Sequence, residues 1–262
     1  LCELGNQAWQ QANAFPGQIS SLIVPADCAW GEFNGKIPPP LKQIKSKKID
    51  ESLIPKSIEA LKKDKSILFI GGKILNEECI KLAAEIASST GCRLITDTFV
   101  SRIRRGNGLP IVEQVPYFAE MAEEFLKNTS NMVFVGTNAP VSFFAYPGKK
   151  SYLAPIDANI IDLCSPDQDG FAALKALSDE AGTSQINSDL IQSGVIDIPT
   201  SGKLDQSSLG PLLASLIPED AIVSDESATS GMLVTPHTWK AKPHDWLALT
   251  GGSIGQGLPL AV

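Results

Sequence analysis

The sequence predicts an α/β protein whose central domain is a doubly wound parallel sheet. Three observations support this fold class. Short strands that are apolar throughout alternate with amphipathic helices between residues 54 and 182. Continuously apolar strands are typical of parallel sheets that are buried on both faces. A proline-rich stretch before this region and a polar stretch after it mark its limits, so we expect a central domain at 54–182 with smaller flanking units.

The order of elements within 54–182 follows from capping and breaker residues. Pro55 favours the first turn of a helix, Asn76 can cap the next helix, and Gly91 can end it. The apolar run at 66–70 ends in two glycines, as expected where a parallel strand turns into a helix. The expected strands are 66–70, 93–96, 131–136 and 159–164, and the expected helices are 55–63, 76–90, 116–127 and 168–181. Residues 102–108 are expected to form a loop rich in arginine and glycine.

The flanking segments are predicted as follows. Residues 1–36 form one short unit, in which 6–14 is a helix and 19–24 an apolar strand closed by a proline. Residues 37–53 are a linker, because three successive prolines continue neither a helix nor a sheet ladder. The lysines of this linker are interpreted as solvated side chains of a connecting segment. A second linker at 183–202 precedes the last unit, 203–262.

The last unit is also read as α/β. We expect a helix at 204–216, a strand at 221–224 and a second strand at 246–249. The second strand runs directly into a stretch of nine residues, 251–259, of which five are glycine or proline. Such spacing allows a ligand to approach the backbone at several points, which a tight turn does not require. Glycines 71 and 72 give a weaker signal, for which a simple tight turn is the favoured interpretation.

Composition narrows the function classes. The formal net charge is −7, which argues against nucleic acid as a partner, because phosphate binding needs clustered Lys and Arg. No apolar run reaches the ~18 residues of a membrane span. The five scattered cysteines and two histidines, His237 and His244, suggest neither a disulfide framework nor a zinc site. Reduced thiols favour a cytoplasmic location, and the histidines are interpreted as surface or packing residues.

Several stretches together resemble a known family. Residues 251–259 read Gly-Gly-Ser-Ile-Gly-Gln-Gly-Leu-Pro, and 223–227 read Val-Ser-Asp-Glu-Ser. With 16–27 and 138–149, these stretches resemble, in the same order, the thiamine-diphosphate-dependent 2-oxo-acid decarboxylases and acetolactate-synthase-like enzymes. The resemblance implies that 1–36 ends a pyrimidine-binding domain and that 203–262 begins a diphosphate-binding domain. The central domain is thus flanked by partial α/β thiamine-diphosphate-binding domains.

The resemblance also implies cofactor-binding residues. The main-chain carbonyl of Gly252 would accept a hydrogen bond from the cofactor's 4′-amino group, and Ile254 would be an apolar wedge beneath the bent cofactor. The loop after the strand at 221–224 would meet the diphosphate, although Glu226 would repel it unless it points away. The implied cofactor-binding residues are Gly251, Gly252, Ser253, Ile254, Ser227, Ala228 and Thr229. From the residues alone, Ile254 could instead be ordinary core, and Thr229 a helix cap.

Other parts of the family's machinery are expected outside this chain. The catalytic glutamate would lie upstream, and the magnesium motif would begin beyond Val262, so no catalytic residue and no metal ligand is predicted here. The chain alone is therefore expected to be inactive. FAD, which some members carry on the central domain, is not favoured. The acidic run expected after the strand at 159–164 is absent, and 136–140 departs from the family pattern.

The resemblance thus implies part of an enzyme that uses thiamine diphosphate and magnesium. Such an enzyme decarboxylates a small 2-oxo acid, carboligates it, or does both, and assembles as a dimer or tetramer. Two interpretations remain beside it. One is a non-catalytic nucleotide- or flavin-binding module, which would not need the second glycine-rich junction at 251–259. The other is a structural spacer that holds two cofactor domains in register.

Overall fold

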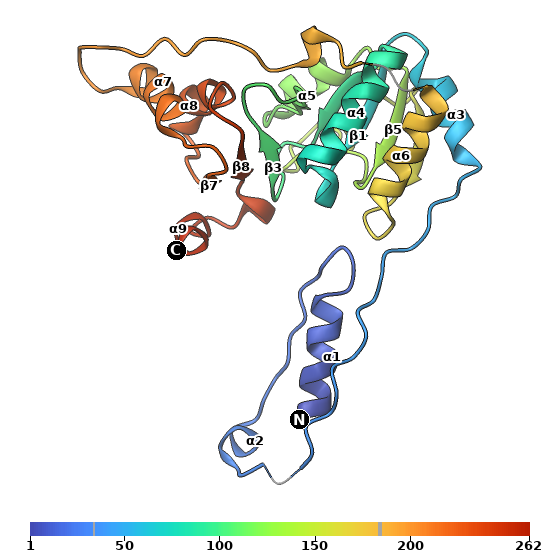
Figure 1. Ribbon diagram of the computed structural model, residues 1–262, viewed down its shortest axis with the longest axis vertical. Coiled ribbons are helices and arrows are strands. Elements are labelled where there is room, and N and C mark those ends of the chain that lie inside the picture. The colour runs from blue at the N-terminus through green and yellow to red at the C-terminus, as the bar shows by residue number, and fades with distance from the viewer. Residues whose placement is uncertain (34, 183–184) are drawn as a thin grey trace.

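A computed structural model describes residues 1–33, 35–182 and 185–262. The chain forms an arm at its N-terminus, a central body built on a parallel sheet, and a smaller C-terminal unit beside that body (Figure 1). None of the helices within the described parts is long and apolar enough to cross a membrane.

The central body is a five-stranded sheet in which every pairing is parallel. Its strands lie in the order β4-β2-β1-β5-β6. Their bounds are β1 (Ser66–Ile70), β2 (Arg93–Thr96), β4 (Glu113–Gln114), β5 (Asn131–Val135) and β6 (Asn159–Cys164). From β1 the chain adds β2 and β4 on one side, and it then adds β5 and β6 on the other side of β1. This change of side between β1 and β5 is the pattern of a doubly wound fold. The predicted fold class is confirmed, and β4, which is only two residues long, was not predicted.

Helices cover both faces of this sheet. Alternate residues of β1 divide between two apolar clusters: Leu68 and Ile70 pack with α3 (Leu53–Leu61), α4 (Glu77–Thr90) and α6 (Gly170–Ala181). Ile67 and Phe69 pack on the opposite face with α5 (Ala119–Leu126). Because successive side chains of a strand point to opposite faces, an apolar run without alternation requires this two-sided cover.

The ends of α4 agree with the capping residues that the sequence indicates. The side chain of Asn76 accepts a hydrogen bond from the backbone N–H of Cys79 at 3.1 Å. Gly91 ends the helix with φ of 78°, in the left-handed region. Like Asn76, Asp169 caps the start of its helix, α6, because its side chain accepts a hydrogen bond from the N–H of Ala172 at 3.0 Å. These local signals fix where two of the covering helices begin and end.

The C-terminal unit contains a second sheet in the order β3-β8-β7. Its elements are α7 (Gln206–Leu216), β7 (Ile222–Ser224), α8 (Gly231–Thr238), β8 (His244–Leu247), η3 (Thr250–Gly252) and α9 (Gly257–Ala261). Strand β3 (Ile103–Arg105) lies within the segment 102–108, so the prediction of a loop there was wrong. Antiparallel pairing with β8, more than a hundred residues later, makes this short polar segment a strand.

Arg105 joins the body to the C-terminal unit. The residue is only 1% exposed, and its guanidinium lies 3.6 Å from the ring centre of Trp246 and 4.6 Å from that of Trp239. It donates to the hydroxyl of Thr238 at 2.5 Å and lies 3.4 Å from Nε2 of His244. Burial lowers the pKa of Arg105 to about 9, so the group remains charged at neutral pH.

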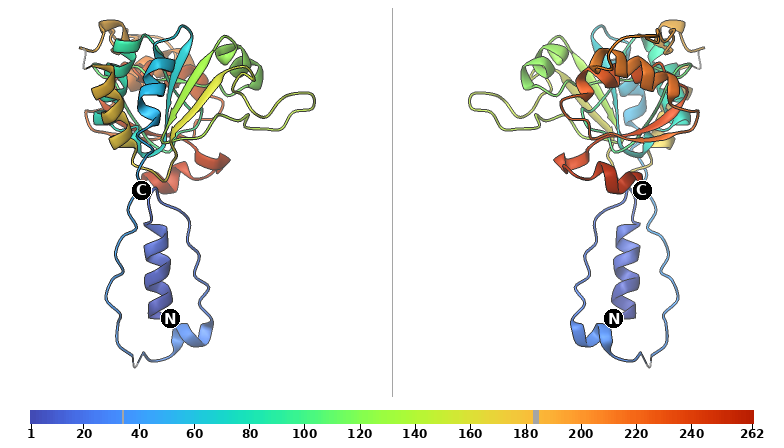
Figure 2. Two further views of the ribbon diagram at one scale, coloured as in Figure 1. Left: turned by 90° about the vertical axis from the view of Figure 1, so that its right-hand side faces the viewer. Right: turned by 90° about the vertical axis from the view of Figure 1, so that its left-hand side faces the viewer.

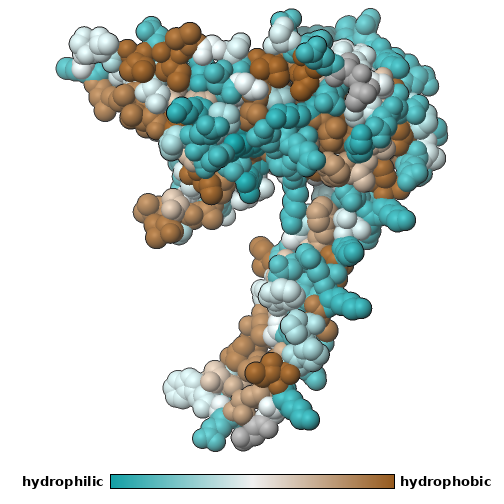
Figure 3. All heavy atoms as spheres, viewed as in Figure 1, coloured by the Kyte–Doolittle hydropathy of each residue, from teal (hydrophilic) through white to brown (hydrophobic). Residues whose placement is uncertain are grey.

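The N-terminal arm contains α1 (Cys2–Ala12) and α2 (Ala26–Trp30) and projects from the body (Figure 1). It meets the body at Phe15, whose ring centre lies 5.2 Å from the ammonium of Lys73. The predicted strand at 19–24 is wrong: this segment is extended but unpaired, and Ile19 and Ile23 are 96% and 91% exposed. A strand needs a neighbour for its backbone groups, and no described residue pairs with this segment. Apolar surface is accordingly visible along the arm (Figure 3).

The two predicted linkers are partly tied to the body. Lys47 pairs with the backbone of Gln168, and its ammonium lies 2.5 Å from the carboxylate of Asp167. In the second linker, η2 (Ser188–Leu190) precedes a bridge between Ile191 and Pro110. Positions 183–184 of that linker, and position 34 of the predicted unit 1–36, lie outside the described residues. The domain boundaries stay predictions.

Replacing Arg105 with Lys should destabilise the protein by about 2 kcal/mol, because the charge stays buried while the planar stack between two indoles is lost. Urea unfolding followed by tryptophan fluorescence measures this. Arg102→Lys is the matched control, since the side chain of Arg102 is 66% exposed and pairs with Asp245; its effect should be within ~0.5 kcal/mol. Equal losses in both variants would contradict the proposed role of the stack.

Candidate functional site

Two loops meet at one edge of the second sheet. Strands β7 and β8 are parallel, with Val223 opposite Trp246 and Ser224 opposite Leu247. Parallel neighbours end at the same edge, so the loops that follow them lie side by side. The segment beginning at Asp225 follows β7, and the glycine-rich loop 250–257 follows β8. The structure therefore brings together the two stretches that the sequence singled out.

The glycine-rich loop depends on left-handed backbone at three positions. Gly251, Gly252 and Gly255 have φ values of 61°, 67° and 95°, a region that side chains other than glycine rarely adopt. Gly252 is also crowded, because a Cβ built there would lie 2.9 Å from the ring of Phe143. That ring comes from the loop between β5 and β6, so the body itself supports the glycine-rich loop.

Glu226 connects the two loops. Its carboxylate accepts hydrogen bonds from the backbone N–H groups of Gly255 and, at 2.7 Å, Gly257. The hydroxyl of Ser224 donates to the carbonyl of Gly257 at 2.9 Å. Gly257 has no room for a side chain, since an added Cβ would lie 2.7 Å from Cβ of Glu226. Glu226 thus braces the glycine-rich loop against the end of β7.

The remaining predicted residues of the first loop are mostly accessible. The Ser227 hydroxyl donates to the carboxylate of Asp225 at 2.5 Å, whereas Ala228 and Thr229 are exposed. Helix α8 begins at Gly231 with Ser230 in the N-cap position. Thr229 is therefore not the cap of this helix, which removes the alternative interpretation of that residue.

Ile254 and Ser253 project from the glycine-rich loop. Both residues are exposed, and Ile254 is 87% accessible. An isoleucine between glycines that buries almost nothing is not ordinary core, so the structural alternative for Ile254 fails. An exposed apolar side chain at this point is available to pack against a ligand.

The two histidines have packing positions. The ring of His237 fills the space beside Gly210, where an added Cβ would lie 2.5 Å away, and so pairs α8 with α7. His244 is fully buried, with its Nδ1 2.7 Å from the carbonyl of Lys242 and its ring beside Trp246. Burial lowers the pKa of His244. These positions agree with the sequence interpretation of both residues as packing groups.

The second pair of glycines that the sequence singled out lies where the strand order of the large sheet changes side, between β1 and β5. Glycines 71 and 72 follow β1, and Gly136 follows β5. A Cβ on Gly72 would lie 2.7 Å from the carbonyl oxygen of Gly136. The glycines are thus required by the close approach of two turns, which supports the tight-turn interpretation. A cavity of about 200 Å³ beside them is lined partly by Lys73 and Pro166.

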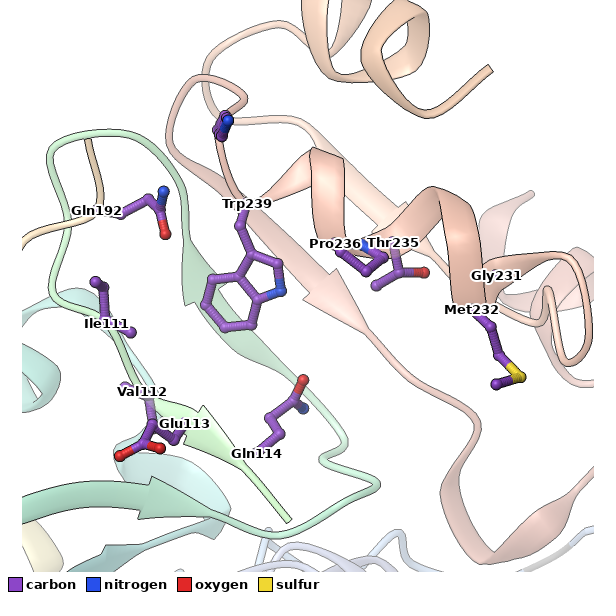
Figure 4. Close-up of a pocket in the computed structure, with 11 residues that line it drawn as sticks. Ile111, Val112, Glu113, Gln114, Gln192, Gly231, Met232, Thr235, Pro236 and Trp239 are labelled. Carbon is purple, nitrogen blue, oxygen red and sulfur yellow. The ribbon is translucent and has the colours of Figure 1, made fainter. Parts of the chain in front are cut away.

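A cavity of about 470 Å³ lies between α8 and the segment that carries β4. Figure 4 shows the indole of Trp239 pointing across this space toward Ile111 and Gln114. The one carboxylate in its lining, Glu113, is held by two bonds to Arg93 at 2.9 and 2.7 Å. Sequence reasoning missed this cavity, because segments far apart in the chain assemble it. Among the residues described, no group of three or more His, Cys, Asp or Glu side chains could hold a metal ion.

Comparison with known protein families finds no match to the chain. Among individual proteins, it is 37% identical over 246 residues to IlvX, an acetolactate-synthase-large-subunit-like protein of Mycobacterium tuberculosis strain H37Rv. That match covers 94% of this chain and 47% of IlvX. The chain is a homologue of an acetolactate-synthase-like protein. It spans about half the length of the curated relative that it matches.

Solved structures show the same fold. A Mycobacterium smegmatis protein assigned to the thiamin diphosphate-dependent enzymes matches with a TM-score of 0.68 and 18% identity, over 98% of this chain and 52% of that one. The thiamine diphosphate-dependent 4-hydroxybenzoylformate decarboxylase of Rhodococcus jostii RHA1 matches with a TM-score of 0.66 and 20% identity, over 99% and 52%. The predicted fold is thereby confirmed, and the 37% identity to IlvX agrees with the resemblance of the motifs.

The burial of His244 predicts a pH-dependent stability. Because its folded-state pKa is lowered, only the unfolded chain takes up a proton here as pH falls through about 6.5. The free energy of unfolding should therefore fall on acidification. The contribution of His244 to this fall should end below its folded-state pKa. Urea unfolding between about pH 8 and pH 5 should show a shallower pH slope in His244→Gln than in the unchanged protein. The His237→Gln variant should keep the contribution from His244; a slope unaffected by His244→Gln would refute the assignment.

Proposed function

We propose that this chain is part of a thiamine-diphosphate-dependent enzyme that decarboxylates a small 2-oxo acid, carboligates it, or does both. One observation carries the proposal: the two loops that the family uses for the cofactor follow neighbouring parallel strands and are connected through Glu226. The homology to an acetolactate-synthase-like protein supports the same reaction class. In this proposal, residues 203–262 begin the diphosphate-binding domain, and 54–182 form the central domain.

The residues of the site fit such a cofactor. Ala228 and Thr229 expose backbone and hydroxyl groups where the diphosphate would be held. Gly252 occupies a position where left-handed φ and the Phe143 ring leave no space for a side chain, as a close backbone contact requires. Ile254 offers exposed apolar surface between two glycine positions. When bound, thiamine diphosphate supplies the electron sink for the loss of carbon dioxide from a 2-oxo acid.

The residues of this chain would bind the cofactor and orient it. The carbonyl of Gly252 would accept a hydrogen bond from the cofactor's amino group, and Ser253 and Gly251 would flank that contact. Glu226 is occupied with the amides of Gly255 and Gly257, so its charge is directed into the loop and away from the diphosphate. The catalytic glutamate and the magnesium ligands are proposed to come from outside this chain, and a homo-oligomer is proposed to complete the site.

Calorimetric titration with thiamine diphosphate and Mg²⁺ tests this function. A polypeptide extended to the length of the relatives should bind tightly, and this chain alone should not. Failure of the extended polypeptide to bind would remove the assignment and leave the cavity beside Gly72 as the place to test FAD and nucleotides.

Within the extended polypeptide, Ile254→Ala should weaken cofactor binding roughly tenfold or more, because an isoleucine side chain contributes about 1.5–3 kcal/mol when it is buried by a ligand. The folded state should lose no stability, since Ile254 is 87% exposed without a ligand. Ile156→Ala is the matched control: Ile156 is 82% exposed and lies on a different loop, so cofactor affinity should not change. Equal affinities in all three proteins would show that Ile254 does not contact the cofactor.

A further inference from the structure

A small cavity lies on the α5 side of the large sheet, and none of the predicted cofactor-binding residues lines it. It measures about 250 Å³ and lies beyond the carboxyl end of β2, beneath the loop that joins β5 to β6. Figure 2 shows that loop projecting from the body on the side of α5. The loop is anchored by the Lys149 ammonium, 2.9 Å from the carboxylate of Glu123 on α5. Within the loop, Val141 pairs with Tyr152.

Three aromatic rings line this cavity and contact one another. Phe99 and Phe143 have ring centres 5.1 Å apart, Tyr117 and Phe143 5.6 Å, and Phe99 and Tyr117 5.7 Å. The rings come from three different loops of the body. Aromatic faces carry partial negative charge, so several of them beside one space favour a positively charged group.

Asp97 is the one charged residue in the lining. It directly follows β2 and accepts a hydrogen bond from the N–H of Thr98 at 2.8 Å. Burial raises the pKa of the Asp97 carboxyl, and the described residues provide it with no ion pair. A half-buried carboxylate without a counter-charge is poorly compensated, and a cation inside the cavity would compensate it.

The hydroxyls of the cavity point to the same chemistry. Thr98 donates its hydroxyl proton to the carbonyl of Val115 at 2.8 Å, and Ser142 donates to the carbonyl of Phe144 at 3.0 Å. With their protons engaged, both oxygens can only accept a hydrogen bond from a ligand. A carboxylate, two acceptor hydroxyls and aromatic faces suit a group that donates N–H bonds and carries positive charge.

We propose that this cavity binds a small primary alkylammonium cation, with its ammonium group at Asp97 and its alkyl chain against Phe99, Tyr117 and Phe143. The volume, below the ~300–1,000 Å³ of pockets for drug-sized ligands, limits the ligand to a short chain. The proposal does not depend on the cofactor function, because none of the residues predicted to contact thiamine diphosphate lines the cavity.

The test is an NMR titration of the protein with propylammonium chloride, read from the ring signals of Phe99, Tyr117 and Phe143. Propan-1-ol, a neutral molecule of the same size, is titrated in parallel at equal ionic strength. Propylammonium should shift the ring signals with saturation and bind at least about tenfold more tightly than propan-1-ol, as expected for a charge-assisted contact. Equal affinities, or no saturable shift at these rings, would overturn the proposal without any variant.

Asp97→Asn gives the second readout. The asparagine oxygen can still accept the bond from the N–H of Thr98, so the fold should persist while the charge is lost. Affinity for propylammonium should fall about tenfold, whereas Asp157→Asn, which removes an exposed carboxylate, should leave it unchanged. Unaltered binding by the Asp97 variant would show that the carboxylate does not recognise the ligand.

Discussion

The burial of Arg105 between two indoles is the interaction on which the arrangement of the molecule depends. Its strand, β3, leaves the central body and becomes the edge of the C-terminal sheet. The guanidinium is compensated by ring faces, the Thr238 hydroxyl and the neighbouring histidine, and no carboxylate of the described residues is in hydrogen-bond contact with it. Moving such a charge out of water costs several kcal/mol, so the contact persists only where the surrounding groups fit it closely.

Arg104 extends this connection on the opposite face of β3. Successive residues of a strand point to opposite sides, and Arg104 therefore points to the face opposite Arg105, where its side chain is 14% exposed. Its guanidinium lies 3.4 Å from Glu77 at the start of α4 and 2.5 Å from Asp220 just before β7. One strand thus ties the first helix after β1 to the start of the C-terminal sheet. These contacts of β3 also fix the position of the loops after β7 and β8, because both strands belong to the same sheet as β3.

How much the sequence predicts depends on how local the determining interactions are. The strand at 66–70 was predicted at its observed bounds, because five successive buried residues leave a continuous apolar run. β3 escaped prediction, since Ile-Arg-Arg becomes a strand only through a partner far away in the chain. The opposite error occurred at 19–24, where a strand-like run has no partner. Composition found the glycine-rich loop, but its brace, Glu226, comes from 29 residues away and is visible only in three dimensions.

The ring of Phe143 places the two proposed sites in physical contact. On one side it contacts the tilted ring of Phe99 in the wall of the cavity, and on the other it fills the space that a Cβ on Gly252 would need. Because the ring lies directly beside Gly252, a shift of the ring caused by a ligand in the cavity would change its contact with that backbone. Coupling of this kind is reciprocal, because a group that favours one ring position at either site changes the affinity at the other by the same factor. A cation beside Asp97 would therefore act on the cofactor loop through the position of one aromatic ring, without touching the loop itself.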